Sequence, residues 1–172
     1  MSRLSPTLVK DTLKDFLYYR IENDSEYIEW AKNFTIPRYI TDNLSRTLRG
    51  YQEEAVKHFI WIYDQDPTKA KHLLFNMSTG AGKTLTMAAV ILFLYEKGYR
   101  NFIFMVHQLQ IIEQAYMNFI DPQFEKYLFN KNGVKINGRS IPVKEIKLFP
   151  DSQGNAINFM FLRRKSSKMT IN

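Results

Sequence analysis

The residues best suited to chemistry lie in one short stretch, 75–84, where an apolar run breaks into a glycine-rich turn that ends in Gly-Lys-Thr. Gly80 and Gly82 allow the backbone to curl so that successive N–H groups point inward, and a helix that starts near Lys83 adds its positive end. This pattern predicts a loop that binds phosphate groups. Lys83 would reach the β and γ phosphates, and the hydroxyl group of Thr84 would hold Mg²⁺.

The flanking sequence supports this interpretation against the alternative of a glycine turn that binds nothing. The run 72–77 is apolar and of strand type, and the mostly apolar run 85–95 reads as a helix closed by Gly98. Met77 stands where the usual consensus has glycine, but the core T-G-x-G-K-T is intact. We therefore predict that ATP and Mg²⁺ bind here. The predicted contacts come from Thr79, Gly80, Ala81, Gly82, Lys83 and Thr84, with Thr84 as the metal ligand.

Composition places the chain among compact globular proteins. Its 172 residues are 45% hydrophobic and 15% aromatic, which is enough for one buried core, and by length it is one domain. The sequence contains no cysteine, so disulfides and cysteine-based zinc sites are excluded. It begins without the apolar core of a signal peptide, and its longest apolar run is shorter than a membrane span of about 20 residues. We expect a soluble cytoplasmic protein.

The positive charge is concentrated near the end of the sequence. Residues 121–172 hold 10 basic and 4 acidic residues, so they carry +6 of the net charge of +7. A basic surface of this kind suits a polyanion such as the DNA backbone, through release of counterions from phosphates. Charge alone supports equally well a solvated face that binds nothing. The residues concerned include Lys131, Lys135, Lys144 and Lys147.

The segments on either side of the loop have helix and strand signals. Ser5 followed by Pro6 predicts the start of an amphipathic helix that runs to Arg20. Asn23 with Glu26 forms a capping-box pattern for a second helix, and Pro37 ends that segment.

Strand signals follow after the loop helix. The run 101–106 is of strand type, and the pair Asn137-Gly138 between two short apolar runs predicts a β-hairpin. Pro142 restricts the second strand of that hairpin to a sheet edge. Residues 157–161 read as one more strand, and the basic residues from Arg163 to Lys168 form an exposed tail.

A glutamine upstream of the loop could recognise a nucleotide base. Gln52 lies in the first turn of a predicted helix in which Ala55, Phe59 and Ile62 recur at helical spacing. A primary amide offers a donor and an acceptor side by side, which matches the N6 and N7 edge of adenine. A lone glutamine is usually just solvated. Its position 28 residues before Gly80 favours the adenine interpretation.

These two elements together resemble a known family. The pairing of L-R-G-Y-Q-x-x-A at 48–55 with M-S-T-G-A-G-K-T at 77–84 resembles the first two nucleotide motifs of superfamily 2 helicases, and within them the motor subunits of type III and type I restriction enzymes. The likeness covers roughly residues 45–120. The strand 101–106 and the residues after it are similar to the family's next motif, which meets DNA phosphates. Gln114 falls where the family often has glutamine, whereas His107 departs from the proline or small polar residue usual there.

The resemblance implies an α/β fold and an ATP-dependent motor. We expect a RecA-like core with a parallel sheet, a helical lead-in over 1–44, a partial motor domain over 45–172, and a basic, β-rich extension and tail over 122–172. It also implies ATP-dependent DNA helicase or translocase activity, non-specific DNA binding through the phosphate backbone, and a specificity or modification methyltransferase subunit as partner.

Hydrolysis in this family needs an acidic pair that the sequence after Lys83 lacks. No two of its acidic residues adjoin, and Asp151, the nearest candidate, follows a proline that would break a central strand. We therefore expect a chain that by itself binds ATP without useful turnover. Two other interpretations stay open, namely a nucleotide-binding remnant or regulator, and a small-molecule kinase with the same kind of loop.

Overall fold

The computed structural model describes residues 17–150 and 154–163. The predicted helix start at Ser5 and Pro6, the candidate acid Asp151 and the basic residues beyond Arg163 lie outside these ranges. The chain divides into two compact units. The helical unit comprises Met1–Ile36 and Gly50–Asn76, and the sheet unit comprises Pro37–Arg49 and Met77–Asn172.

The helical unit is built from helices that pack through aromatic side chains. Its described helices are α2 (Leu17–Glu22), α3 (Ser25–Asn33) and α5 (Gly50–Gln65). Trp30 stacks on Phe34 at 4.2 Å between ring centroids and lies 5.3 Å from Trp61 of α5. These rings, with the buried Val56 and Ile60 of α5, bury apolar surface that short helices need for stability in water.

The predicted cap of the second helix is wrong by one residue. Asp24, not Asn23, is the N-cap of α3, because its carboxylate accepts hydrogen bonds from the backbone N–H groups of Glu26 at 2.8 Å and Tyr27 at 3.3 Å. The amide of Asn23 instead donates to the carbonyl of Tyr19 in α2. A carboxylate at a helix N-terminus makes charge-assisted bonds and also meets the positive end of the helix dipole, which explains the shift.

The sheet unit is mixed α/β with a small parallel sheet. Its elements are α4 (Arg38–Thr41), α6 (Lys83–Glu96), β1 (Asn101–Val106), α7 (Leu109–Ile120), β2 (Val134–Ile136), β3 (Arg139–Ile141), β4 (Val143–Glu145) and β5 (Ile157–Arg163). Three strands form one sheet in the order β1-β5-β4, and both pairings are parallel. The predicted strands 101–106 and 157–161 are confirmed, but the second is the central strand of this sheet.

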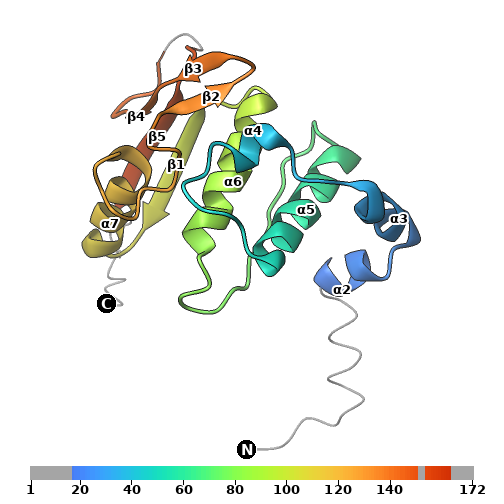
Figure 1. Cartoon of the computed structure of the whole chain (residues 1–172). Helices are drawn as coiled ribbons and strands as arrows, with labels where there is room; N and C mark the ends of the chain where they lie inside the picture. Colours follow the sequence, from blue (N-terminus) through green and yellow to red (C-terminus); the bar gives the residue numbers. More distant parts are fainter. Residues whose placement is uncertain (1–16, 151–153, 164–172) are drawn as a thin grey trace, which may run out of the picture. The chain divides into compact units, whose positions relative to one another are not determined.

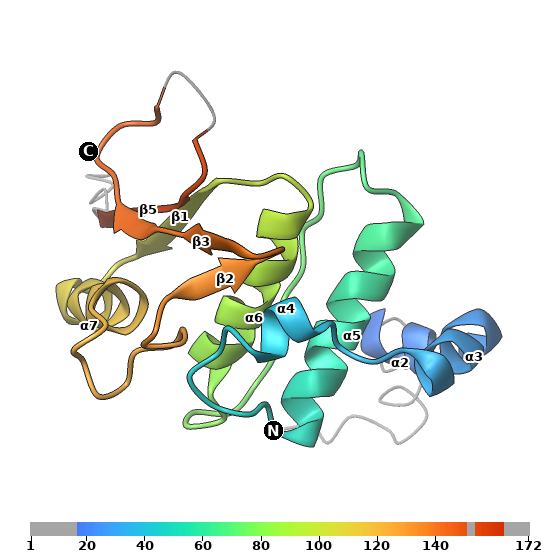
Figure 2. The same ribbon diagram turned by 45° about the horizontal axis from the view of Figure 1, so that its top comes forward.

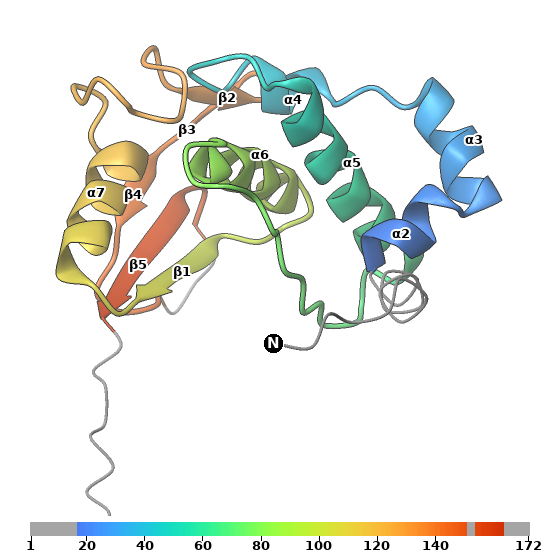
Figure 3. The ribbon, with the colours of Figure 1, turned by 90° about the horizontal axis from the view of Figure 1, so that it is seen from below.

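Helices lie on both sides of the parallel sheet. Figures 1 and 3 show α7 on one side of the sheet and α6 on the other. Phe119 of α7 is fully buried, with its ring 4.8 Å from Phe159 of β5 and 6.0 Å from Phe129. A parallel sheet needs apolar cover on both faces, and this aromatic cluster supplies the cover on the α7 side.

The predicted hairpin is confirmed and is held to α4 by one side chain. Asn137 has φ 51° and Gly138 has φ 74°, the positive pair that a tight two-residue turn requires. Asn43, which is buried just after α4, donates to the carbonyl of Lys135 at 2.8 Å and accepts from its N–H at 2.6 Å. Figure 2 shows β2, β3, α4 and α6 side by side. The Asn43 amide thus pairs with β2 as a neighbouring strand would.

The strand predicted at 72–77 does not form. These residues have no helix or strand assignment, although their side chains alternate between half-buried and exposed as in a strand, and Leu74 is 92% exposed. An isolated extended segment leaves its backbone groups without ladder partners, so apolar sequence alone does not make a strand. The prediction was wrong because strand formation needs a partner strand, which the local sequence does not supply.

Replacement of Gly98 by alanine should destabilise the sheet unit. Gly98 ends α6 with φ 101°, and its N–H and that of Tyr99 bond to the carbonyls of Tyr95 and Leu94, both at 3.0 Å. Alanine in this left-handed region costs roughly 1–2 kcal/mol. Urea unfolding followed by circular dichroism should show this loss. Gly154→Ala is the matched control, since Gly154 lies outside the positive-φ range and has open space around it. Equal stability of the two variants would contradict the assignment.

Candidate functional site

The predicted phosphate loop has the curled backbone that its glycines allow. Gly80 has φ 80° and Gly82 has φ 74°, both in the left-handed region. The N–H of Ala81 donates to the carbonyl of Ser78 at 3.2 Å, which closes the turn, and Gly82 is the N-cap of α6. The chain therefore turns from an extended segment into a helix within a few residues, as a phosphate loop must.

Lys83 bends back over the start of this loop. Its ammonium group donates to the carbonyls of Met77 at 2.8 Å and Ser78 at 2.9 Å. An ammonium group carries three N–H donors, so these two bonds within the described chain leave one donor for a phosphate oxygen. Met77, the departure from the usual consensus, contributes only its carbonyl group to this contact. Any residue type supplies that group, so the departure does not disturb the lysine.

The remaining loop residues fit a nucleotide phosphate and its cation. The N–H groups of Lys83 and Thr84 lie in the first turn of α6, where no carbonyl of the helix can accept from them, and the helix dipole is positive there. Thr79, Gly80 and Gly82 are exposed, and nothing stands within 4 Å of the position of a Cβ atom on Gly80. Thr84 is half-buried in the same turn, and a hydroxyl oxygen there suits Mg²⁺.

Gln52 lies in the first turn of α5, as predicted, and its side chain is only 3% exposed. It is therefore not an ordinary solvated glutamine. It belongs to the helical unit, whereas Thr79, Gly80, Ala81, Gly82, Lys83 and Thr84 belong to the sheet unit. The role of Gln52 in reading adenine stays a prediction.

The carboxyl edge of the parallel sheet brings together two residues that the sequence analysis treated separately. The register pairs Val106 at the end of β1 with Arg163 at the end of β5, and the Arg163 side chain donates to the carbonyl of His107 at 3.3 Å. His107 and Gln114 of α7 are exposed. The carboxyl edge is where open parallel sheets bind ligands. The sequence assigned Arg163 to the tail because the pairing of β1 with β5 has no local signal.

No helix among the described residues combines the length and apolar character that a membrane crossing requires.

Comparison with known proteins gives one consistent result. Residues 45–169 match the family described as "Type III restriction enzyme, res subunit". The chain is 35% identical over 163 residues to the probable type III restriction-modification enzyme HindVIP Res subunit of Haemophilus influenzae. This alignment covers 89% of the chain and 31% of the relative, so the chain spans about a third of that protein's length. No solved structure matches the chain.

The family match covers most of the chain and includes both the phosphate loop and Gln52. The chain therefore belongs to the family of type III restriction enzyme Res subunits.

Proposed function

We propose that this chain forms the ATP-binding part of the first motor domain of an ATP-dependent DNA helicase or translocase of the restriction-enzyme type. The observation that carries the proposal is the loop at 77–84, where two left-handed glycines, a helix N-terminus and the bent Lys83 converge. The family typically binds ATP with Mg²⁺. In this chain Lys83 would contact the phosphates and Thr84 would hold the cation, which would neutralise charge on the phosphate oxygens.

The fold supports a RecA-like core within a larger domain. The parallel sheet, the helices on its two sides and the direct step from the glycine loop into helix α6 agree with that fold, which the family implies. In this proposal residues 1–44 are a helical lead-in and residues 45–172 are part of the motor domain, with 122–172 as its basic extension. One face of β1 supports this, since the apolar side chains of Ile103 and Met105 on it are 52% and 56% exposed. Parallel sheets normally bury such strands.

DNA and a modification subunit are the proposed partners, as for Res subunits generally. Lys135 and Arg139 on the hairpin β2–β3 are exposed, while Val134, Ile136 and Ile141 of the same hairpin are buried. The buried side chains anchor the hairpin, and its two basic side chains project into solvent. Such groups contact phosphates without reading bases, so the proposed DNA binding is indifferent to sequence.

Lys83→Ala should abolish ATP-Mg binding with little effect on the fold. The exposed ammonium group supplies charge to phosphates and packs against nothing in the core, and each charge-assisted bond to a phosphate contributes about 1.5–3 kcal/mol. Isothermal titration calorimetry measures the affinity, and circular dichroism checks the fold. Lys97→Ala, near the other end of α6, serves as a control that removes a lysine outside the loop. Equal ATP affinity in Lys83→Ala and wild type would contradict the assignment of this loop as the phosphate site.

Gln52→Ala should reduce the preference for ATP over GTP. On the N7 edge adenine offers a donor and an acceptor, whereas guanine offers two acceptors. We therefore expect the substitution to weaken the binding of ATP and to change that of GTP little. Each of the two hydrogen bonds that the amide would make to adenine corresponds to about 0.5–1.5 kcal/mol. Competition binding of the two nucleotides gives the ratio for both proteins. A wild-type protein without any preference for ATP would show that Gln52 has no such role.

The Lys135→Gln, Arg139→Gln double variant should weaken DNA binding equally for unrelated sequences. For each phosphate that a side chain no longer neutralises, the slope of log K against log salt becomes shallower by about 0.9 for duplex DNA. Fluorescence anisotropy over a range of salt concentrations measures both the affinity and this slope. Lys32→Gln, an exposed lysine paired with Glu29 in α3, is the control for a general loss of charge. Binding that does not change between low and physiological salt would exclude the electrostatic account.

A further inference from the structure

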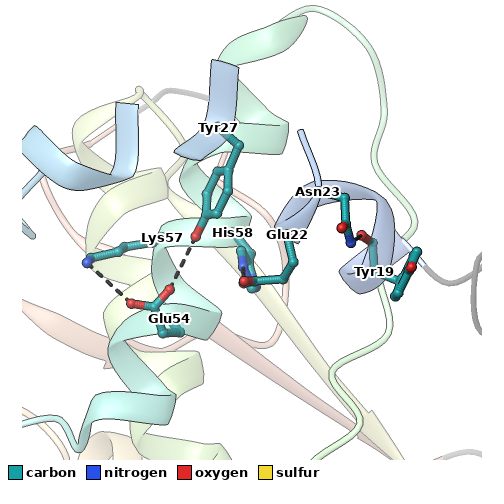
Figure 4. A network of polar contacts seen from close by, with 7 residues as sticks. All are labelled: Tyr19, Glu22, Asn23, Tyr27, Glu54, Lys57 and His58. Carbon is teal, nitrogen blue, oxygen red and sulfur yellow. Dashed lines mark hydrogen bonds and ion pairs between the residues drawn. The ribbon is translucent and has the colours of Figure 1, made fainter. Parts of the chain in front are cut away.

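Two polar contacts join the segment before α5 to one face of that helix (Figure 4). The hydroxyl of Tyr27 donates to Glu54 Oε2 at 3.2 Å, and His58 Nε2 lies 2.7 Å from Glu22 Oε1. Glu54 and His58 are four residues apart in α5, so they lie on the same face, one turn apart. We refer to Glu22, Tyr27, Glu54 and His58 as the α5 clamp.

The bonds within the clamp indicate a structural role and not a metal site. Glu22, Glu54 and His58 offer ligand atoms within 4.8 Å of one another. Both oxygens of Glu54 are already bonded, however, Oε1 to the ammonium group of Lys57 at 3.3 Å and Oε2 to Tyr27. A divalent cation would have to approach beside this ammonium group and replace the existing bonds. The hydrogen bonds that these side chains already make hold the helices together and leave their polar groups satisfied.

Tyr27 is the fixed point of the clamp. It is 3% exposed, and its ring contacts those of Trp30, His58 and Trp61 at centroid distances of 5.9, 5.1 and 5.8 Å. Burial, reinforced by the negative charge of Glu54, raises the pKa of the Tyr27 hydroxyl, so the group stays protonated and donates at neutral pH. The packed ring therefore holds a hydrogen-bond donor at a defined position against α5.

The clamp acts on the part of α5 that carries Gln52. Glu54 follows Gln52 by two residues, within the first two turns of the helix. Residues two apart on a helix point to roughly opposite sides, so a bond to Glu54 adds to the restraint that the buried Val56 places on the rotation of these turns, without occupying the side of Gln52. A pair of hydrogen bonds to a base edge depends steeply on angle, so this rotation decides whether an amide can make both.

We propose that Tyr27 and Glu54 are positioning residues for base recognition, since their bond holds the first turns of α5 in the rotation that presents the Gln52 amide. The inference rests on the proposed function, in which Gln52 reads adenine. Contacts with the triphosphate come from the loop at 77–84 and need no help from this bond. Loss of the clamp therefore changes the discrimination between bases and leaves triphosphate binding unchanged.

The test compares Tyr27→Phe with Tyr19→Phe. The first variant keeps the packed ring and removes only the hydroxyl that bonds Glu54, and the second removes a tyrosine hydroxyl of α2 outside the clamp. Titration calorimetry of each protein with ATP, GTP and tripolyphosphate gives three affinities. We expect Tyr27→Phe to lower the ATP-to-GTP ratio by about two- to tenfold, the range of one hydrogen bond, with unchanged tripolyphosphate affinity. Tyr19→Phe should keep the wild-type ratio.

A second pair of variants tests the other partner of the bond. Glu54→Gln keeps an oxygen that can accept from Tyr27, so its preference for ATP over GTP should stay close to that of the wild type. Glu54→Ala has no such oxygen and should lose most of this preference. An unchanged ratio in both Tyr27→Phe and Glu54→Ala would overturn the inference. An equal loss of affinity for ATP, GTP and tripolyphosphate would also overturn it, because that result indicates general destabilisation of the protein. A wild-type protein that binds neither nucleotide would instead overturn the proposed function itself, before any variant is compared.

Discussion

The parallel pairing of β1 with β5 is the constraint on which the sheet unit depends. Two parallel strands cannot be joined by a tight turn, so the chain between them must leave the sheet and return. Residues 107–156 make this crossover and contain α7, the hairpin and β4. Phe119 of α7 then packs on Phe159 of β5, and this contact holds the crossover against the sheet. The same pairing sets the carboxyl ends of β1 and β5 at one edge, where Arg163 meets His107.

The phosphate loop, by contrast, is shaped by contacts close in sequence. Its turn depends on the positive φ of Gly80 and Gly82 and on bonds that span no more than six residues, including those from Lys83 to Met77 and Ser78. It keeps this shape although the segment before it is not paired in a strand. Local chemistry of this kind can be read from sequence, which is why the turn of the loop agrees with the prediction, whereas the strand predicted before it does not form.

The same distinction explains the other differences between prediction and structure. The turn at Asn137-Gly138 and the glycine end of α6 were predictable because both depend on backbone conformations that few residues adopt. The pairing of β5 with β1 and the bond from Tyr27 to Glu54 join residues 27 or more positions apart. The periodicity of the sequence cannot predict such contacts. The cap at Asp24 was missed for another reason. Asn23 and Asp24 are both good caps by residue type, and only the structure shows which of them accepts the capping bonds.

The bonds of Lys83 have a consequence for how strongly the loop could hold a phosphate. A free lysine side chain loses up to about 2 kcal/mol of rotamer entropy when it is fixed in one position. In this structure the side chain is already held by two carbonyl groups, with its charge over the loop. A phosphate that takes the remaining donor gains the charge-assisted bond without ordering the side chain anew. In the proposed function the carbonyls of Met77 and Ser78 would therefore contribute to the affinity for phosphate although they repel it themselves, because they set the position of the ammonium group before the ligand binds.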